Sequence, residues 1–229
     1  MFRQLDSDVW YLDKPFKMMG FELGGRMTVV KLVDGSLLMV SPVKMNAEDL
    51  AELDRLGPVR HVVAPNLMHH LYVGDAKAAY PDAKLYLPPG LTDKRKDLVP
   101  DGILSDQPPP ALAAEFEQHL VQGMPKLNEV VFFHKKSRTL IQTDLAFNVT
   151  QMSSWLGRIL FTLNGALGGV RATKVLRRLI ADSSATRRSI EKILAWDFDR
   201  MIITHGDVVR SGAKTEFAAA YQFLLGKKS

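Results

Sequence analysis

The sequence contains no cysteine among its 229 residues. This absence excludes disulfide bonds, thiolate metal ligands and a thiol nucleophile. It is compatible with a reducing compartment, and we expect a cytoplasmic protein. Aspartates at positions 6, 8 and 13 interrupt any apolar run near the start of the chain. No secretory signal peptide is therefore expected.

Long apolar runs are also scarce. The longest extends from Trp155 to Val170 and contains Arg158, Asn164 and four glycines. It is too short and too interrupted to span a bilayer, so no transmembrane segment is predicted. We interpret it as a buried or cavity-lining helix, with a surface that contacts membrane or lipid as the alternative. Its composition predicts that residues 150–170 form a lid or wall for an apolar or amphiphilic small-molecule ligand.

Neither sign of charge dominates strongly, because 30 lysines and arginines face 25 acidic residues and give a formal net charge of +5. No basic block with interleaved aromatic residues occurs, so we expect no nucleic-acid partner. The segment from Arg171 to Lys192 holds seven basic residues against Asp182 and Glu191. This pattern favours a solvated helix face, with a surface for anions or lipid headgroups as the alternative.

The content of 46% hydrophobic and 24% charged residues is that of an ordinary globular protein. Apolar and β-branched runs bounded by turn residues predict strands, and Asp34-Gly35 between two of them predicts a hairpin turn. These strands are residues 9–12, 26–32, 36–40, 60–64, 85–87, 129–133, 139–144 and 201–203. Helices are predicted over 46–53 with Asn46 as N-cap, about 69–80, within 150–196, and over 216–225. Strands followed by helices occur in both halves of the chain, and two such halves can stack as helix, sheet, sheet and helix.

Four side chains able to bind a metal ion follow predicted strands. His69 and His70 come after residues 60–64, Asp144 ends residues 139–144, and His205 follows residues 201–203. Ligand sites form where loops from several strand ends converge. Imidazole and carboxylate groups there suit one divalent metal, with zinc preferred and iron or manganese as alternatives. The ordinary alternatives are a histidine pair bonded to backbone, a capping aspartate and a plain turn.

Several motifs along the chain resemble the metallo-β-lactamase-fold superfamily. The hairpin at Asp34-Gly35 is similar to the opening strands of that family, and residues 60–70 occupy the place of its strand and H-x-H-x-D-H loop. Residues 80–86, 123–125, 140–144 and 202–207 are similar to its later motifs. The chain resembles most an uncharacterised branch known only as a domain of unknown function. The resemblance implies a four-layer αββα sandwich, in a single domain of residues 1–229 with a helical insertion at about 150–196.

The losses of metal ligands fall on one of the two metal sites of the family, and at the other site His69 replaces the aspartate of the H-x-H-x-D-H loop. Pro65, Leu67 and Met124 stand where that pattern has the histidines of one site. The positions of the other site are occupied by His69, His70, Asp144 and His205, and all four side chains can bind a metal ion. The resemblance therefore implies a reduced, mononuclear site. We prefer His70 over His69, because His70 matches a histidine of the family pattern.

Polar residues beside these ligands, namely Asn66, Thr204 and Asp207, are predicted to support the ligands or to contact substrate. The resulting hypothesis is a metal-dependent hydrolase. Four protein ligands would fill a tetrahedron, so hydrolysis requires a fifth position or one of His69 and His70 turned away. The alternatives are a metal-free member that binds a small or amphiphilic molecule in the same cleft, and a scaffold that serves protein interaction.

Overall fold

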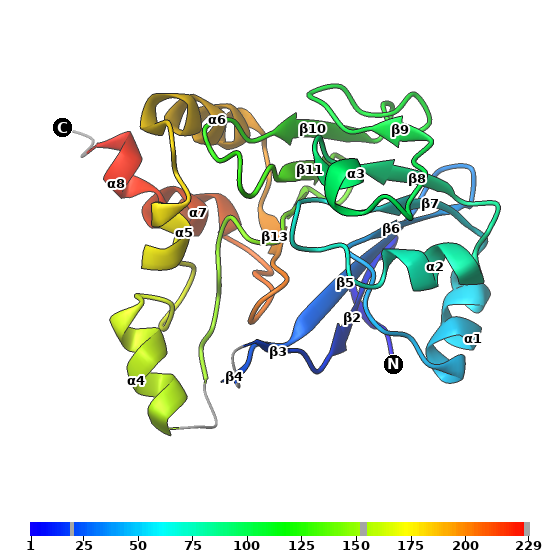
Figure 1. Cartoon of the computed structure of the whole chain (residues 1–229), viewed down its shortest axis with the longest axis horizontal. Coiled ribbons are helices and arrows are strands. Elements are labelled where there is room, and N and C mark those ends of the chain that lie inside the picture. The colour runs from blue at the N-terminus through cyan, green and yellow to red at the C-terminus, as the bar shows by residue number, and fades with distance from the viewer. Residues whose placement is uncertain (19–20, 152–154, 227–229) are drawn as a thin grey trace.

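The computed structural model describes residues 1–18, 21–151 and 155–226, which form two main sheets between layers of helices (Figure 1). The first sheet has seven strands in the order β1-β2-β5-β6-β7-β8-β9. Their bounds are β1 Arg3–Asp6, β2 Val9–Lys14, β5 Gly25–Lys31, β6 Leu37–Val40, β7 Val59–Val63, β8 Lys84–Leu87 and β9 Gly102–Ile103. Pairing is antiparallel from β1 to β6 and parallel from β6 to β9.

Local sequence signals determine much of this first half. The β5–β6 hairpin turns at Asp34-Gly35, where Gly35 has a φ of +82° and its N–H donates to the Leu32 carbonyl. Helix α1 (Ala47–Leu56) begins after Asn46, which forms a reciprocal capping box with Asp49. Both devices satisfy backbone groups through neighbours in sequence, so they act independently of the rest of the fold.

The second sheet has four strands in the order β10-β11-β12-β13. Their bounds are β10 Phe116–Leu120, β11 Val130–His134, β12 Thr139–Ile141 and β13 Arg200–Ile202. The first three are antiparallel, and β12 pairs with β13 in parallel. A small ribbon of β3 (Lys17–Met18) and β4 (Phe21–Glu22) is separate from both sheets.

Three apolar clusters define four layers. One packs the first sheet against α1, α2 (Val73–Ala79) and α3 (Leu91–Lys94), and a second packs the other sheet against α5 (Lys174–Arg178), α6 (Ser183–Ala195) and α7 (Ala213–Ala220). The third lies between the sheets and includes Val30 and Phe132. Figure 1 shows α1 and α2 on the opposite side of the strands from α5 and α7. The αββα sandwich is thereby confirmed.

Several predicted boundaries are wrong. The helix predicted over 69–80 begins only at Val73, and the strand predicted over 139–144 ends at Ile141. Side chains accept the backbone N–H groups of His69, Thr143 and Asp144, so regular structure stops short of the site. The closing helix is divided at Tyr221 into α7 and α8 (Gln222–Leu225). Strand β1 was not predicted, because its sequence RQLD has little β propensity.

Residues 155–196 form three separate helices, α4 (Trp155–Leu163), α5 and α6. Part of the predicted helical segment, residues 152–154, lies outside the described residues. Among the described helices, none combines the length and the apolar character needed to cross a bilayer.

Candidate metal centre

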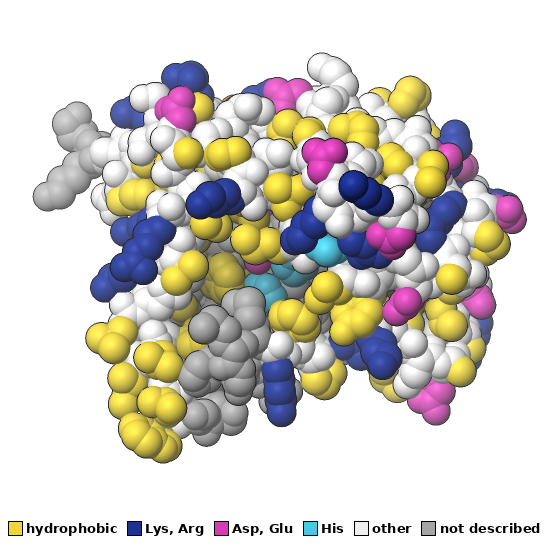
Figure 2. Space-filling view, in the orientation of Figure 1, with side chains coloured by type: hydrophobic (Ala, Val, Ile, Leu, Met, Phe, Trp, Pro, Cys, Tyr) yellow, Lys and Arg dark blue, Asp and Glu magenta, His cyan; other side chains and the backbone are white. Residues whose placement is uncertain are grey.

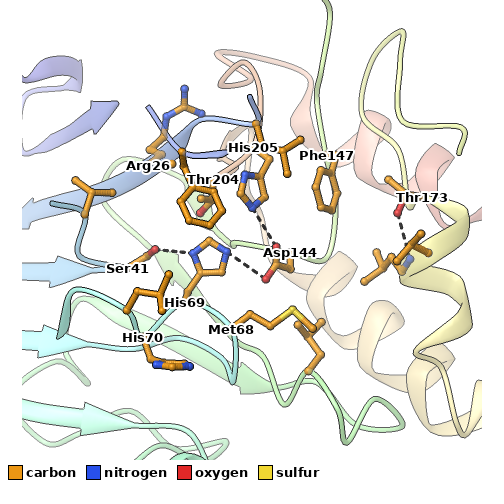
Figure 3. A pocket seen from close by; sticks show the side chains of 18 of the residues that line it. Arg26, Ser41, Met68, His69, His70, Asp144, Phe147, Thr173, Thr204 and His205 are labelled. Carbon is orange, nitrogen blue, oxygen red and sulfur yellow. Dashed lines mark hydrogen bonds and ion pairs between the residues drawn. The ribbon is translucent and has the colours of Figure 1, made fainter. Parts of the chain in front are cut away.

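His69, Asp144 and His205 meet at one edge of the two sheets (Figure 3). They come from the loops after β7, β12 and β13, where the carboxyl ends of strands converge. Nε2 of His69 lies 3.2 Å from Oδ2 of Asp144, and Nε2 of His205 lies 3.4 Å from Oδ1 of the same carboxylate. One ligand atom from each residue fits within 4.8 Å of the other two. Asp144 and His205 are buried and His69 is only partly exposed.

His70 does not join this cluster, which corrects the preference for it over His69. Its Nδ1 lies 3.1 Å from Nη1 of Arg95, and the same guanidinium donates a hydrogen bond of 2.8 Å to the His70 carbonyl. The two histidines are adjacent in a turn, so their side chains leave the backbone in different directions. Burial, followed by the positive charges of Lys94 and Arg95, lowers the pKa of His70 below its ordinary value. His70 therefore lies at the rim of the site rather than at its centre.

The outer nitrogen of each clustered histidine has a partner that orients the ring. Nδ1 of His205 donates to the carbonyl oxygen of Gly24 over 2.9 Å, and Nδ1 of His69 lies 2.9 Å from Oγ of Ser41. Since a carbonyl only accepts, the proton of neutral His205 is on Nδ1 and its Nε2 lone pair points at Asp144. Phe147 stacks on the His205 ring, with centroids 5.1 Å apart and planes at 16°. This arrangement fixes both the ring and the nitrogen that a metal would use.

A buried polar network beneath the cluster holds the loops that carry it. Nδ2 of Asn66 donates to Oδ2 of Asp144 over 2.8 Å. Oδ1 of Asn66 accepts the backbone N–H groups of Met68 and His69. Glu129 has no exposed surface and accepts the backbone N–H groups of Thr143 and Asp144. Asn66 also donates to Glu129 over 3.1 Å. The network thus joins the loops after β7 and β12.

Charges in the cluster shift each other's protonation. Burial lowers the pKa of His69, but attraction to Asp144, its hydrogen bond to that carboxylate and the charge of Glu129 outweigh burial and raise it. Burial raises the pKa of Asp144, yet His69 and His205 together hold it well below its usual range. Burial and the negative charge of Asp144 raise the pKa of Glu129 to about 7. These shifts favour the ionised form of Asp144.

The three polar residues predicted to support the ligands, Asn66, Thr204 and Asp207, differ in whether they contact the cluster. Asn66 contacts it directly, and Thr204 is buried and lines the adjoining cavity. Asp207 is exposed and contacts Thr150 and Asn148 instead. Sequence reasoning missed Glu129, Ser41 and Gly24. Glu129 is the first residue of the strand predicted over 129–133, and nothing local indicates that it becomes fully buried.

A cavity of about 520 Å³ opens in front of the cluster. Its polar floor includes His69, Asp144 and His205, and most of the remaining wall is apolar. Apolar lining residues come from several parts of the chain. They include Phe16, Leu23 and Val43 from the first 45 residues, Met68 and Leu71 from the loop after β7, Leu127 and Phe147 from the loops around β11 and β12, and Phe161, Val175, Leu176 and Leu179 from the helical segments after residue 155. Figure 2 shows the cyan histidines at the bottom of this hollow among yellow side chains.

The donor set fits one divalent metal ion. Ligand bonds of about 2.1 Å in a tetrahedron place neighbouring donor atoms about 3.4 Å apart. Nε2 of His69 lies 3.2 Å from Oδ2 of Asp144 and Nε2 of His205 lies 3.4 Å from Oδ1, so each imidazole is at this spacing from a different oxygen of the carboxylate. One ligand atom from each of the three residues lies within 4.8 Å of the others. A bare Nε2 lone pair of His205 beside a carboxylate oxygen is repulsive unless a proton or a metal cation lies between them. Two imidazoles and one carboxylate suit zinc, iron or manganese.

Solved structures with the same architecture are metallo-β-lactamases. The chain aligns with a metallo-beta-lactamase from Pontibacter korlensis at 12% identity and TM-score 0.67, covering 99% of each chain. One from Hirschia baltica aligns at 12% identity and TM-score 0.65, covering 100% of this chain and 99% of that chain. The DIM-1 metallo-beta-lactamase exposed to ceftazidime aligns at 14% identity and TM-score 0.64, covering 96% and 97%. The protein therefore has the metallo-β-lactamase fold.

The chain belongs to the family described as Domain of unknown function (DUF4336), which matches residues 6–159. No curated protein matches the sequence. The positions that depart from the superfamily pattern have apolar surroundings, because Pro65 and Met124 are buried and Leu67 packs against the core of the first sheet. This chain therefore retains the fold and lacks three of the histidines expected from the resemblance.

Proposed function

We propose that the protein is a metal-dependent hydrolase with a mononuclear site. The observation that carries the proposal is the convergence of His69, Asp144 and His205 at the floor of a cavity. Three protein ligands leave a coordination position open, as catalytic zinc sites do, whereas four would close the site. The placement of His70 outside the cluster supports this reading. Zinc is the first candidate, and iron or manganese suit the same ligands.

A divalent metal held there would lower the pKa of a bound water toward about 7 and polarise a carbonyl or phosphoryl oxygen. Neighbouring groups of the protein orient the three ligand side chains. Gly24 and Ser41 orient the two imidazoles, and Asn66 orients the carboxylate. The apolar wall of the cavity displaces water from a bound substrate and favours one with an apolar part.

Metal content and chelator-sensitive hydrolysis test the proposal together. Protein without a histidine tag, produced with zinc, manganese and iron in the medium, should contain about one metal ion per chain by elemental analysis. It should hydrolyse p-nitrophenyl acyl esters or bis(p-nitrophenyl) phosphate, and a chelator should abolish the activity. Absence of metal under all three supplements would refute the site. Metal without hydrolysis of either substrate class would refute the hydrolase.

The mainly apolar cavity favours one alternative, a metal-free protein that binds an amphiphilic small molecule in the same cleft. In that case Asp144 would bridge two protonated imidazoles rather than hold a metal with them. The alternative predicts thermal stabilisation by fatty acids or acyl phosphates in metal-free protein, with no effect of added zinc. A flat ligand panel together with zinc-dependent stabilisation would exclude it.

A further inference from the structure

The helix α4 exposes an apolar surface that the rest of the described structure leaves uncovered. The exposed fractions of Trp155 and Leu163 are 76% and 62%, and Leu156, Ile159 and Leu160 are each exposed by 42–47%. Gly157 is the one buried residue of the helix. Contiguous exposed apolar surface of this kind marks a site of interaction with another surface.

The apolar side chains lie on one side of the helix. With about 100° per residue, Trp155, Ile159, Leu163, Leu156 and Leu160 fall within an arc of about 140°. Gly157 and Phe161 lie on the opposite side, and Phe161 lines the cavity. The helix therefore presents one apolar side to the cavity and another to the outside.

The charged residues of this segment are all basic. Residues 155–181 contain Arg158, Arg171, Lys174, Arg177 and Arg178, and no aspartate or glutamate. All five are exposed, and within the described parts of the chain none of them forms an ion pair with a carboxylate. Figure 2 shows apolar side chains gathered at the lower left, over α4, with dark blue side chains above them at the left edge.

Two hydrogen bonds accepted by Asn164 join the apolar and basic parts. The carbonyl oxygen of Asn164, just after α4, accepts the N–H of Lys174 over 2.9 Å, and its Oδ1 accepts the N–H of Val175 over 3.0 Å. The end of α4 is thereby attached to the start of α5. Val175, with an exposed fraction of 55%, extends the apolar surface toward the basic residues.

We propose that α4 and the segment 171–178 form a docking surface for an anionic lipid bilayer. An apolar helix face with a tryptophan at its edge and cations beside it matches the headgroup boundary, where acyl chains and negative charge meet. A second copy of the chain is disfavoured as the occupant, because a symmetric contact would bring two surfaces of five cations together. Nucleic acid would leave the five apolar side chains without a partner. The inference does not depend on the metal site.

Vesicle binding tests this surface directly. Vesicles of phosphatidylcholine with about one-third phosphatidylglycerol should bind the protein at about 0.15 M salt, and phosphatidylcholine alone should bind it weakly. Trp155 is the most exposed of the three tryptophans, so its fluorescence should shift to shorter wavelength on binding, and Trp155→Phe should remove that shift. No binding to anionic vesicles under these conditions would overturn the proposal.

Matched apolar variants separate α4 from the rest of the surface. The double variant Ile159→Asp with Leu163→Asp should weaken vesicle binding by about tenfold or more. The control, Val33→Asp with Val99→Asp, changes residues that are 85% and 81% exposed elsewhere and should bind as the unmodified protein does. Equal loss in both pairs, or loss in neither, would overturn the role of α4. Circular dichroism and the melting temperature verify that all variants are folded.

Matched charge variants distinguish this surface from the general attraction of a basic protein. Lys174→Glu with Arg178→Glu should reduce binding by about tenfold or more. Arg60→Glu with Lys84→Glu changes the net charge equally at two exposed positions on β7 and β8, and should have a smaller effect. Equal effects would overturn the proposal. Sedimentation of the lipid-free protein as a dimer that Leu163→Asp dissociates would assign the surface to a second copy and also overturn it.

Discussion

Asn66 donates a hydrogen bond of 2.8 Å to Oδ2 of Asp144, which lies 78 positions further along the chain. Its side-chain oxygen also accepts the backbone N–H of His69 over 2.7 Å. One buried amide therefore contacts both the carboxylate of Asp144 and the backbone of His69. Because its two ends have opposite hydrogen-bonding character, neither an apolar residue nor a carboxylate can replace it at both contacts.

Replacement of Asn66 by alanine should weaken metal binding without removing a ligand. We expect the dissociation constant for zinc to rise by about 10–100-fold, as for other groups that orient metal ligands. Competition with a chromophoric chelator measures this change. An affinity equal to that of the unmodified protein would show that the loops after β7 and β12 hold their positions without the amide.

The two adjacent histidines offer a matched pair of variants. His69→Ala should reduce the metal content from about one ion per chain to near zero, because it removes one of three ligands. His70→Ala should retain the metal, since its ring contacts Arg95 rather than Asp144. Elemental analysis after dialysis against metal-free buffer measures both. Loss of metal from His70→Ala, with retention in His69→Ala, would reverse the assignment.

Gly206 fixes the loop that carries His205. Its φ is +101°, and a Cβ added there would lie 2.1 Å from the carbonyl oxygen of Asn148. Gly206→Ala should therefore lower the free energy of unfolding by more than about 2 kcal/mol and weaken metal binding as the loop shifts. Gly212→Ala is the control, because Gly212 also has a positive φ of +72° but nothing within 4 Å of the added Cβ. Urea denaturation should give about 1 kcal/mol or less for the control, and equal losses would contradict the packing argument.

His134 should make the protein less stable in acid. Burial lowers its pKa, against the opposing attraction of Asp8 and Asp6, while the charge of Lys136 lowers it further. Its Nδ1 is bonded to Ser137 and its Nε2 has no partner among the described residues, so the folded state resists a second proton. Since the unfolded histidine binds a proton below about pH 6.5, the free energy of unfolding should fall as the pH drops through that value.

The replacement His134→Gln removes this titration. The free energy of unfolding of the variant, measured by urea denaturation between about pH 5 and 8, should depend less on pH than that of the unmodified protein. The other histidines are common to both proteins and cancel in the comparison. Identical pH dependence would mean that His134 takes up its proton equally in both states.

Local sequence patterns predicted the elements whose hydrogen bonds are local. The hairpin at Asp34-Gly35 and the cap at Asn46 are confirmed, because each depends on residues within a few positions. The predicted helix and strand boundaries were wrong where these elements approach the cavity. The backbone N–H of His69 bonds to Asn66, and those of Thr143 and Asp144 bond to Glu129 in place of a strand neighbour. Glu129 is at least 14 positions from both partners, beyond the range of any local pattern.

The sequence by itself indicated the αββα architecture, through its resemblance to the metallo-β-lactamase-fold superfamily and an order of strands and helices compatible with it. It also supplied the nitrogen and oxygen ligands at strand ends. Only the tertiary structure decided that His69 rather than His70 faces Asp144 and His205. Side-chain direction in a turn depends on backbone angles set by contacts across the two sheets. The tertiary structure also decided that the apolar run after Trp155 presents a second, outward face. Burial depends on how the chain packs and not on residue type alone.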